Sequence, residues 1–408
     1  MLTEKQQEIL TQTAADTPMG KLLRCYWMPI AASCDLEVGA VRPTRLLGED
    51  LVLFRKSNGE LGLIESRCPH RGTSLAYGYV DGEGIRCPYH GWKFAPSGRC
   101  LEMPAEPKSN VLCEQVAVRG YPVQELGGLI FAYLGTQPAP LLPHYDLFVW
   151  EGTIRDIGYA VLPCNWLQIM ENSVDPYHLE WLHGHHLGYI RQKSGKSVPT
   201  HYPKRQVQIG FDVFEYGIIK RRILEGGSED DDDWKIGHPL IFPLMLRVGC
   251  HPQHRFQIRV PVDDTHTLHF WYSCYQPTQE VEIPKQEIIP SYEVPWRDER
   301  GEFILDFVDG QDIMSWVTQG AIADRTQEHL TPGDRGIVLY RRLLFEQLEK
   351  VQRGEDPLGV IRSPELNQII ELPQEKNKFG QGRSFLAESM EMSHVRYSPL
   401  KNLLAQIL

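Results

Sequence analysis

The amino-acid sequence predicts an α+β protein of two domains, and three regions of the chain carry this prediction. Short apolar runs separated by glycine, proline and asparagine fill residues 26–134, which is typical of small antiparallel strands. Segments of alternating polarity recur between residues 206 and 276, and a helical period follows Pro295. A length of 408 residues suits two or three domains of ordinary size.

The first elements in chain order belong to the N-terminal domain. Thr3 and Gln6 stand in the positions of a capping box, which predicts a short helix at the start of the chain. The strand-rich segment comes next, and the three prolines within residues 137–143 form a stiff connector. We therefore expect a small all-β domain with an N-terminal helix over residues 1–140 and a second domain over residues 141–408.

The second domain is expected to combine a sheet with helices. A helical segment over residues 168–183 precedes the period-two segments 211–216 and 254–260, which predict strands with one buried face. The acidic run 229–233 is expected to be a solvated loop. Near the C-terminus, a helix that ends at Gly354 is predicted by apolar residues at three- and four-residue steps, namely Tyr340, Leu343, Leu344, Leu348 and Val351.

Composition excludes several classes of function. The chain carries 42 Lys and Arg against 53 Asp and Glu, and this net charge of −11 gives no general attraction to nucleic acid or membranes. No signal peptide and no apolar run of about 18 residues is apparent, so we expect a cytoplasmic protein. Nine cysteines are too few for a disulfide framework, so they are expected to be thiols or metal ligands.

Two short segments each offer one cysteine and one histidine. Cys68 and His70 form C-x-H, and after a gap of sixteen residues Cys87 and His90 form C-x2-H. A zinc finger presents its cysteines together and its histidines later, which differs from this order. The spacing instead favours a [2Fe–2S] cluster in which the two cysteines hold one iron and the two histidines hold the other.

A second set of metal-ligand types follows downstream. Asp175, His178 and His183 form D-x2-H-x4-H, and two imidazoles with one carboxylate suit a mononuclear Fe(II) site. Residues five apart on an α-helix differ by about 140° in azimuth, so either a wider turn separates the histidines or His183 lies at a frayed helix end. We favour the frayed end. His185 and His186 remain alternative ligands, and Asp175 before proline could equally cap a helix.

These motifs resemble those of a known family. Residues 68–71 (CPHR) and 87–92 (CPYHGW) resemble the Rieske signature, without the two additional cysteines of respiratory Rieske proteins, whose positions hold Thr73 and Tyr89. With the downstream histidines, the chain resembles the oxygenase (alpha) subunit of Rieske non-haem iron aromatic-ring oxygenases. The resemblance implies a catalytic domain of the helix-grip type, a Rieske [2Fe–2S] cluster and a mononuclear Fe(II).

The resemblance also implies roles for individual residues. His178 and His183 would bind the mononuclear iron, and Asn172 would lie near it. Asp175 would link His178 to His90 of a neighbouring subunit, which implies a homotrimer. The third ligand would be a carboxylate far along the chain, for which the candidates are Asp306, Asp309, Asp312 and Asp324. Asp312 best resembles the ligand of the family's C-terminal helix.

Within the family, residues 17–20, 47–50 and 162–166 resemble the group of phthalate 4,5-dioxygenase and 5,5′-dehydrodivanillate O-demethylase, and residues 170–184 resemble the demethylase more. This implies O2-dependent oxidation of an aromatic carboxylate, with O-demethylation of a methoxylated aromatic acid as the expected reaction. Cis-dihydroxylation of an acid such as phthalate is the alternative. An alternative of another class is a Rieske electron carrier with a ligand-binding domain.

Partners follow from the same interpretation. The sequence has no flavin or nicotinamide motif, so a separate NAD(P)H-dependent flavin or ferredoxin reductase is expected to supply electrons. A basic side chain should bind the substrate carboxylate. The candidates lie in the strand-rich region and are Arg247, Arg255 and Arg259. The seven cysteines other than Cys68 and Cys87 are expected to be ordinary thiols.

Overall fold

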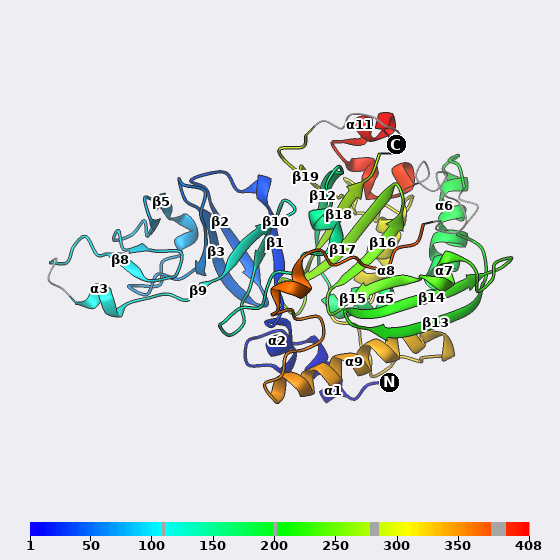
Figure 1. Cartoon of the computed structure of the whole chain (residues 1–408), viewed down its shortest axis with the longest axis horizontal. Helices are drawn as coiled ribbons and strands as arrows, with labels where there is room; N and C mark the ends of the chain where they lie inside the picture. The colour runs from blue at the N-terminus through cyan, green and yellow to red at the C-terminus, as the bar shows by residue number, and fades with distance from the viewer. Residues whose placement is uncertain (108–110, 199–201, 278–284, 377–388, 408) are drawn as a thin grey trace.

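The computed structural model of the chain describes residues 1–107, 111–198, 202–277, 285–376 and 389–407. Small sheets occupy one end of the elongated molecule, and a large sheet with its helices occupies the other (Figure 1). The predicted α+β class is confirmed.

The small sheets are built from antiparallel strands, as expected for this part of the chain. They pair in the orders β1-β11-β10, β2-β3-β4-β9 and β5-β6-β7-β8. The strands are β1 (Met28–Ala32), β2 (Val41–Leu46), β3 (Glu49–Arg55), β4 (Leu61–Glu65), β5 (Tyr79–Asp81), β6 (Gly84–Arg86), β7 (Lys93–Phe94), β8 (Cys100–Glu102), β9 (Gly120–Tyr121), β10 (Val123–Leu126) and β11 (Leu129–Ala132).

The helices described in this stretch of sequence are α1 (Glu4–Thr11), α2 (Pro18–Leu23) and α3 (Leu112–Gln115). The capping box is confirmed, because Thr3 Oγ1 accepts from Gln6 N–H while the Gln6 side chain accepts from Thr3 N–H. Although they come first in the chain, α1 and α2 pack against helices of the larger part.

The large sheet has eight strands in the order β13-β14-β15-β16-β17-β18-β12-β19. They are β12 (Ile154–Leu162), β13 (Gln206–Phe214), β14 (Gly217–Leu224), β15 (His238–Ile241), β16 (Met245–Cys250), β17 (Gln253–Pro261), β18 (Thr267–Tyr275) and β19 (Ser291–Glu293). Neighbouring strands run antiparallel, as in the helix-grip type that the resemblance implied, except at one edge, where β19 runs parallel to β12.

The helices of the larger part are α4 (Asp146–Val149), α5 (Trp166–Ser173), α6 (Leu187–Lys193), α7 (Asp232–Lys235), α8 (Val308–Val317), α9 (Arg335–Gln352) and α11 (Lys401–Ile407), with a π-helix at Leu179–His186. Short 3-10 turns lie at Ser33–Asp35, Leu75–Tyr77, Pro332–Asp334, Pro364–Asn367 and His394–Tyr397. The helix predicted from the apolar period is confirmed as α9, and Gly354 follows its end with a φ of +77°.

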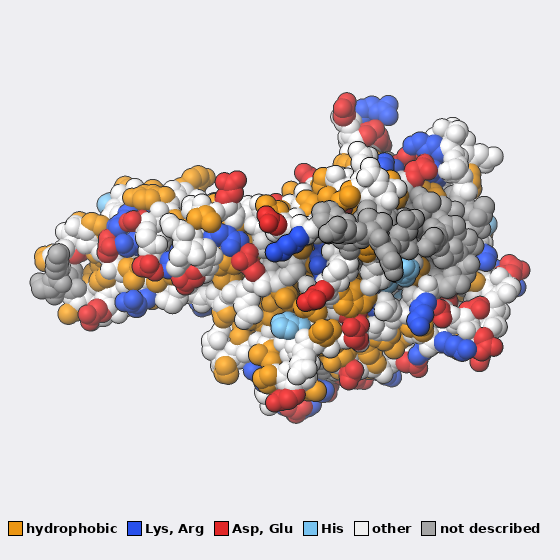
Figure 2. Space-filling model, turned by 45° about the horizontal axis from the view of Figure 1, so that its top comes forward, with side chains coloured by type: hydrophobic (Ala, Val, Ile, Leu, Met, Phe, Trp, Pro, Cys, Tyr) orange, Lys and Arg blue, Asp and Glu red, His pale blue; other side chains and the backbone are white. Residues whose placement is uncertain are grey.

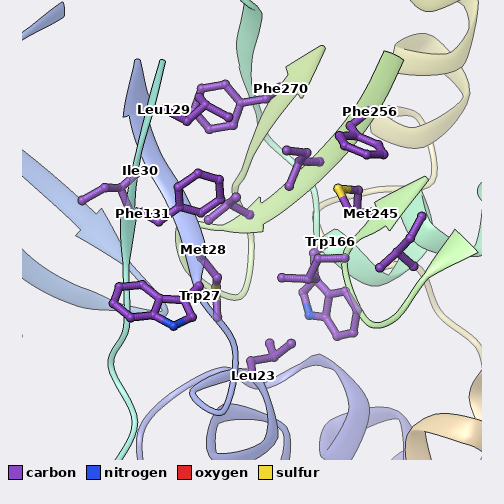
Figure 3. Close-up of a cluster of buried hydrophobic side chains, with 14 of the residues drawn as sticks. Leu23, Trp27, Met28, Ile30, Leu129, Phe131, Trp166, Met245, Phe256 and Phe270 are labelled. Carbon is purple, nitrogen blue, oxygen red and sulfur yellow. The ribbon is translucent and has the colours of Figure 1, made fainter. Parts of the chain in front are cut away.

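The central strand β17 is buried at all nine positions, so the expectation of one exposed face is wrong here. One face carries Phe256 and Ile258, which belong to a core shared with β1 and β11. Figure 3 shows Phe131 and Leu129 of β11 facing Phe256 and Phe270 across this core. The opposite, polar face is covered by α8 and by the C-terminal segment that begins at residue 389.

The acidic run is also not a purely solvated loop. Its last member, Asp233, is 5% exposed and accepts from Arg222 Nε at 2.8 Å, because α7 turns this carboxylate inward. The remaining charge is dispersed, and Figure 2 shows acidic and basic side chains interspersed over one face of the molecule. Among the described residues, the search for a helix long and apolar enough to cross a membrane found none.

Candidate active site

Two matching turns present the first group of predicted ligands. In the first turn, Cys68 N–H donates to Thr73 O and Gly72 N–H donates to Cys68 O, at 2.9 and 2.8 Å. The second turn joins β6 to β7 and repeats this pattern, with Cys87 N–H bonded to Trp92 O and Gly91 N–H bonded to Cys87 O. Gly72 and Gly91 both have a φ near +75°, which glycine adopts without strain.

The donor set fits a [2Fe–2S] cluster. Cys68 and Cys87 are buried, whereas His70 is exposed and His90 half-buried on the outer side. The two imidazole rings lie 4.5 Å apart, and His70 stacks on Trp92 at 4.6 Å. Each turn thus contributes one thiol inside and one imidazole outside, which is the division of ligands that a Rieske cluster requires.

His178, His183 and Asp312 converge in the larger part. His183 Nε2 lies 3.2 Å from Asp312 Oδ1, and His178 Nε2 lies 4.0 Å from the same oxygen. Ligand atoms at right angles on a metal about 2.1 Å away would be about 3 Å apart. Asp312 Oδ1 is buried without a hydrogen-bond partner among the described residues. The three donors therefore fit a metal with two-histidine, one-carboxylate ligation.

The histidine spacing is explained by a π-helix, so the favoured frayed end is wrong and the wider turn is correct. Residues Leu179–His186 are π-helical, and Leu187 N–H donates to Leu182 O, five residues back. Because the wider turn carries about five residues between bonded groups, residues 178 and 183 lie on nearly the same side. The expected continuous helix over 168–183 is therefore two helices, α5 and this π-helix.

Gln311 contacts both His183 and His186, and sequence reasoning missed its role. Its Oε1 lies 3.3 Å from His183 Nδ1, and its Nε2 lies 3.1 Å from His186 Nδ1. This contact orients His183 so that Nε2 points toward Asp312. His185 instead packs on the exposed ring of Trp181.

Of the four candidate carboxylates, Asp312 is the one placed with the histidines. Asp309 accepts from Trp271 Nε1 at 2.8 Å and from His394 N–H at 2.7 Å. Asp306 forms ion pairs with Lys196 and Arg396, and Asp324 accepts from Thr326. Asp309, one helical turn before Asp312 on α8, also lines the cavity, but its two oxygens are taken by Trp271 and His394.

Asp175 caps the turn that follows it and also contacts His178 of the same chain. Its Oδ1 accepts from Tyr177 N–H at 2.8 Å, which caps the following turn, while its Oδ2 lies 3.4 Å from His178 Nδ1. Burial raises the pKa of the Asp175 carboxyl, but its hydrogen bond to His178 and the His178 charge outweigh burial, and the pKa is lowered overall. Asn172, at the end of α5, lines the same cavity as the three converging donors.

The cavity at the three donors has an empty volume of about 780 Å³, which includes its opening. Arg255 lines it together with Gln257, the next residue but one on β17. Arg259 lies farther along this face and donates to Gln257 O, and it is not among the lining residues. Arg247 also lies outside the lining, where it forms an ion pair with Asp146 at 3.1 Å.

A second group of possible ligands lies beside this cavity, and its His238 is one of the lining residues. Asp233, His238 and Glu375 are buried close together, and sequence reasoning did not join them because they come from distant segments. Arg222 donates to Asp233 at 2.8 Å and lies 3.3 Å from His238 Nε2. The Arg222 guanidinium thus already offsets one of the two carboxylate charges of this group and occupies an oxygen of Asp233, which argues against a cation there.

The fold, the cysteine–histidine turns and the two-histidine, one-carboxylate site together define an iron-dependent oxygenase with an electron-transfer domain. The family described as Rieske [2Fe-2S] domain matches residues 26–122, and the family described as LigXa C-terminal domain like matches residues 299–375.

The 5,5'-dehydrodivanillate O-demethylase oxygenase subunit of Sphingobium sp. is 41% identical over 376 residues, covering 91% of this chain and 87% of that protein. The phthalate 4,5-dioxygenase oxygenase subunit of Pseudomonas putida is 31% identical, covering 88% and 89%. The chain belongs to the Rieske non-haem iron oxygenases, which carry a [2Fe–2S] cluster and a mononuclear iron.

Solved structures share the fold at lower identity. The terminal oxygenase of carbazole 1,9a-dioxygenase from Novosphingobium sp. KA1 matches with a TM-score of 0.60 at 21% identity, covering 84% of this chain and 97% of that chain. The NdmA protein of Pseudomonas putida CBB5 matches with a TM-score of 0.61 at 21% identity, covering 83% and 94%.

Proposed function

We propose that this oxygenase component removes a methyl group from a methoxylated aromatic acid. The reaction consumes the substrate, O2, NAD(P)H and a proton. It yields the phenol, formaldehyde, water and NAD(P)+, because hydroxylation of the methyl carbon gives a hemiacetal that releases formaldehyde. The observation that carries the proposal is the 41% identity to the O-demethylase subunit over nearly the whole chain.

We assign Cys68, His70, Cys87 and His90 to the cluster and His178, His183 and Asp312 to the mononuclear iron. When bound, these groups supply one-electron relay and O2 activation. The chain's own contribution is to hold Asp312 and the histidines in place through Gln311 and α8, and to enclose the substrate beside them. Residues 1–140 form the proposed electron-transfer domain, and residues 141–408 form the catalytic domain.

Arg255 is the proposed anchor for the substrate carboxylate. Six buried arginines of the described chain lie within 4 Å of a carboxylate: Arg24, Arg191, Arg222, Arg247, Arg325 and Arg341. Arg255 and Arg259 have no such partner among the described residues, although they are 6% and 0% exposed. Burying a charge without a counter-ion is costly, and Arg255 lines the cavity, where an anionic substrate would compensate it.

A homotrimer and a separate reductase complete the proposal. The sheet β5-β6-β7-β8, which carries the second cluster turn, lies at the far tip of the molecule from α8 (Figure 1). This separation supports electron transfer from the cluster of one subunit to the iron of the next, through Asp175. An NAD(P)H-dependent reductase, with or without a ferredoxin, would reduce the cluster.

Reconstitution tests the reaction. The purified protein is combined with a reductase, NADH and O2, and offered methoxylated and unmethoxylated aromatic acids. Formaldehyde formed in proportion to O2 consumed supports O-demethylation, whereas a cis-diol supports the dioxygenase alternative. About three iron atoms per chain are expected for a cluster plus a mononuclear site, and two iron atoms without substrate-dependent O2 uptake would leave only an electron carrier.

Replacing the anchor tests the substrate class. Arg255→Gln removes a charge-assisted hydrogen bond worth about 1.5–3 kcal/mol, so KM for the acid should rise roughly tenfold to a hundredfold. The methyl ester of the same acid is the control, because it lacks the anionic group. An equal loss for acid and ester would show that Arg255 does not recognise the carboxylate.

A further inference from the structure

Two cysteines outside the cluster ligands lie against each other in the N-terminal part. Cys113 Sγ is 3.5 Å from Cys100 Sγ, so the two thiols are in direct contact. Cys100 lies on β8 and is 2% exposed, whereas Cys113 lies on α3 and is only half-buried. Figure 1 shows α3 beside β8 at the tip of the molecule.

The backbone fixes this contact from both sides. Cys100 N–H donates to Val116 O at 3.2 Å, and Arg99 forms an isolated β-bridge with Ala117. Cys113 belongs to the single helical turn that directly precedes Val116. The two chain segments are therefore held side by side, and closing the sulfur separation from 3.5 Å to the disulfide length of about 2.05 Å requires only a small adjustment.

The surroundings give the two thiols different accessibility. Cys100 packs in the same small core as Cys68 and Cys87, where small oxidants have little access. Cys113 reaches the surface and is the thiol that an oxidant in solution would meet first.

We propose that Cys100 and Cys113 form a reversible disulfide in the presence of hydrogen peroxide. Cys113–SH reacts with H2O2 to give Cys113–SOH and water, and Cys100–SH then displaces a second water as the S–S bond forms. Two thiols are oxidised by two electrons in total, and both peroxide oxygens end as water. The new bond ties α3 to β8, in the sheet that also carries the β6–β7 cluster turn.

The test uses the holoenzyme treated with peroxide, followed by denaturation, alkylation of the remaining thiols, digestion and mass spectrometry. The expected product is a cross-linked pair of peptides containing Cys100 and Cys113, which dithiothreitol separates. Cys113→Ser should abolish the cross-link. Cys34→Ser is the matched control, because Cys34 is exposed and, among the described residues, its sulfur has hydrogen-bond contacts with Asp35 and Ser291 and none with another cysteine.

A second measurement keeps the test independent of any folding defect in the variants. Oxidised wild type should retain its cluster absorbance to a higher temperature than reduced wild type, and Cys113→Ser should show no such shift. The proposal is overturned if both cysteines are alkylated after peroxide treatment. It is equally overturned if the cross-link forms only in protein that has already lost its cluster absorbance, since the thiols would then pair only after unfolding.

Discussion

At the scale of single residues, one oxygen of the Asp312 carboxylate points toward two histidines and has no hydrogen-bond donor among the residues that the structure describes. We therefore expect Asp312→Ala to lower the iron content from about three atoms per chain to about two. The cluster spectrum should be unchanged, because Asp312 belongs to neither of the two turns that present the cluster ligands. Asp324→Ala is the control, since that carboxylate is exposed. Retention of mononuclear iron and turnover in Asp312→Ala would exclude this ligand.

His394, also a single residue, leads to a prediction about how the stability of the folded protein depends on pH. It is fully buried, with Nε2 3.1 Å from Ser273 Oγ and Nδ1 3.3 Å from Arg255, and burial lowers its pKa to about 4. In the unfolded chain it would titrate near 6.5. Between these values the unfolded state binds more protons, so the stability that neutral His394 contributes is lost as pH falls from about 6.5 to 4.

His394→Gln should therefore flatten the dependence of unfolding free energy on pH within that window. Urea unfolding at several pH values compares the variant with wild type. The affected slope is at most about 1.4 kcal/mol per pH unit for one group. Equal slopes for the two proteins would show that His394 does not resist protonation in the folded state.

At the scale of elements, a buried ion cluster joins α5 to α9. Glu171 on α5 accepts from Arg325 at 2.8 Å and from Arg341 of α9 at 2.7 Å, and Arg341 also pairs with Glu328. The two arginines keep the pKa of Glu171 below its usual value, although burial opposes them. This cluster fixes the helix whose C-terminal end supplies Asn172 to the cavity.

Removing the Glu171 charge should be strongly destabilising. Glu171→Gln leaves Arg325 buried without a carboxylate, and breaking a buried pair costs about 3–5 kcal/mol. Glu346→Gln is the matched control, because its ion pair with Arg342 on α9 is exposed and should be worth less than about 1 kcal/mol. Chemical denaturation compares both variants, and equal effects would contradict the role of the buried cluster.

At the scale of the whole molecule, the proposed electron path crosses between subunits. His90→Ala should disable the cluster, and Asp312→Ala should disable the mononuclear site. Coexpressed with different tags and purified as mixed assemblies, these inactive variants should regain a fraction of wild-type turnover, because an intact cluster can then face an intact iron site across an interface. Mixed assemblies that contain both metal centres and remain inactive would contradict transfer between subunits, as would a monomeric active protein.

Sequence reasoning could predict those parts of the site whose residues lie close together along the chain. The two cluster turns each close within six residues, so their glycines and backbone bonds follow from local preference. The capping box at Thr3 and the apolar period of α9 are local in the same sense. The local spacing of the histidines could not show how His183 reaches the metal site. A π-helix is rare, and this one depends on surrounding contacts such as that of Gln311.

The sequence by itself determined the family, the two kinds of metal site and the short loops that present the cluster ligands, because these signals lie within contiguous segments. Only the tertiary structure decided which of four aspartates meets the histidines, and which of three arginines lines the cavity. It also showed that the polar face of β17 is buried. Such choices depend on how distant segments pack, and alternation along a strand reveals two faces without revealing what covers each one.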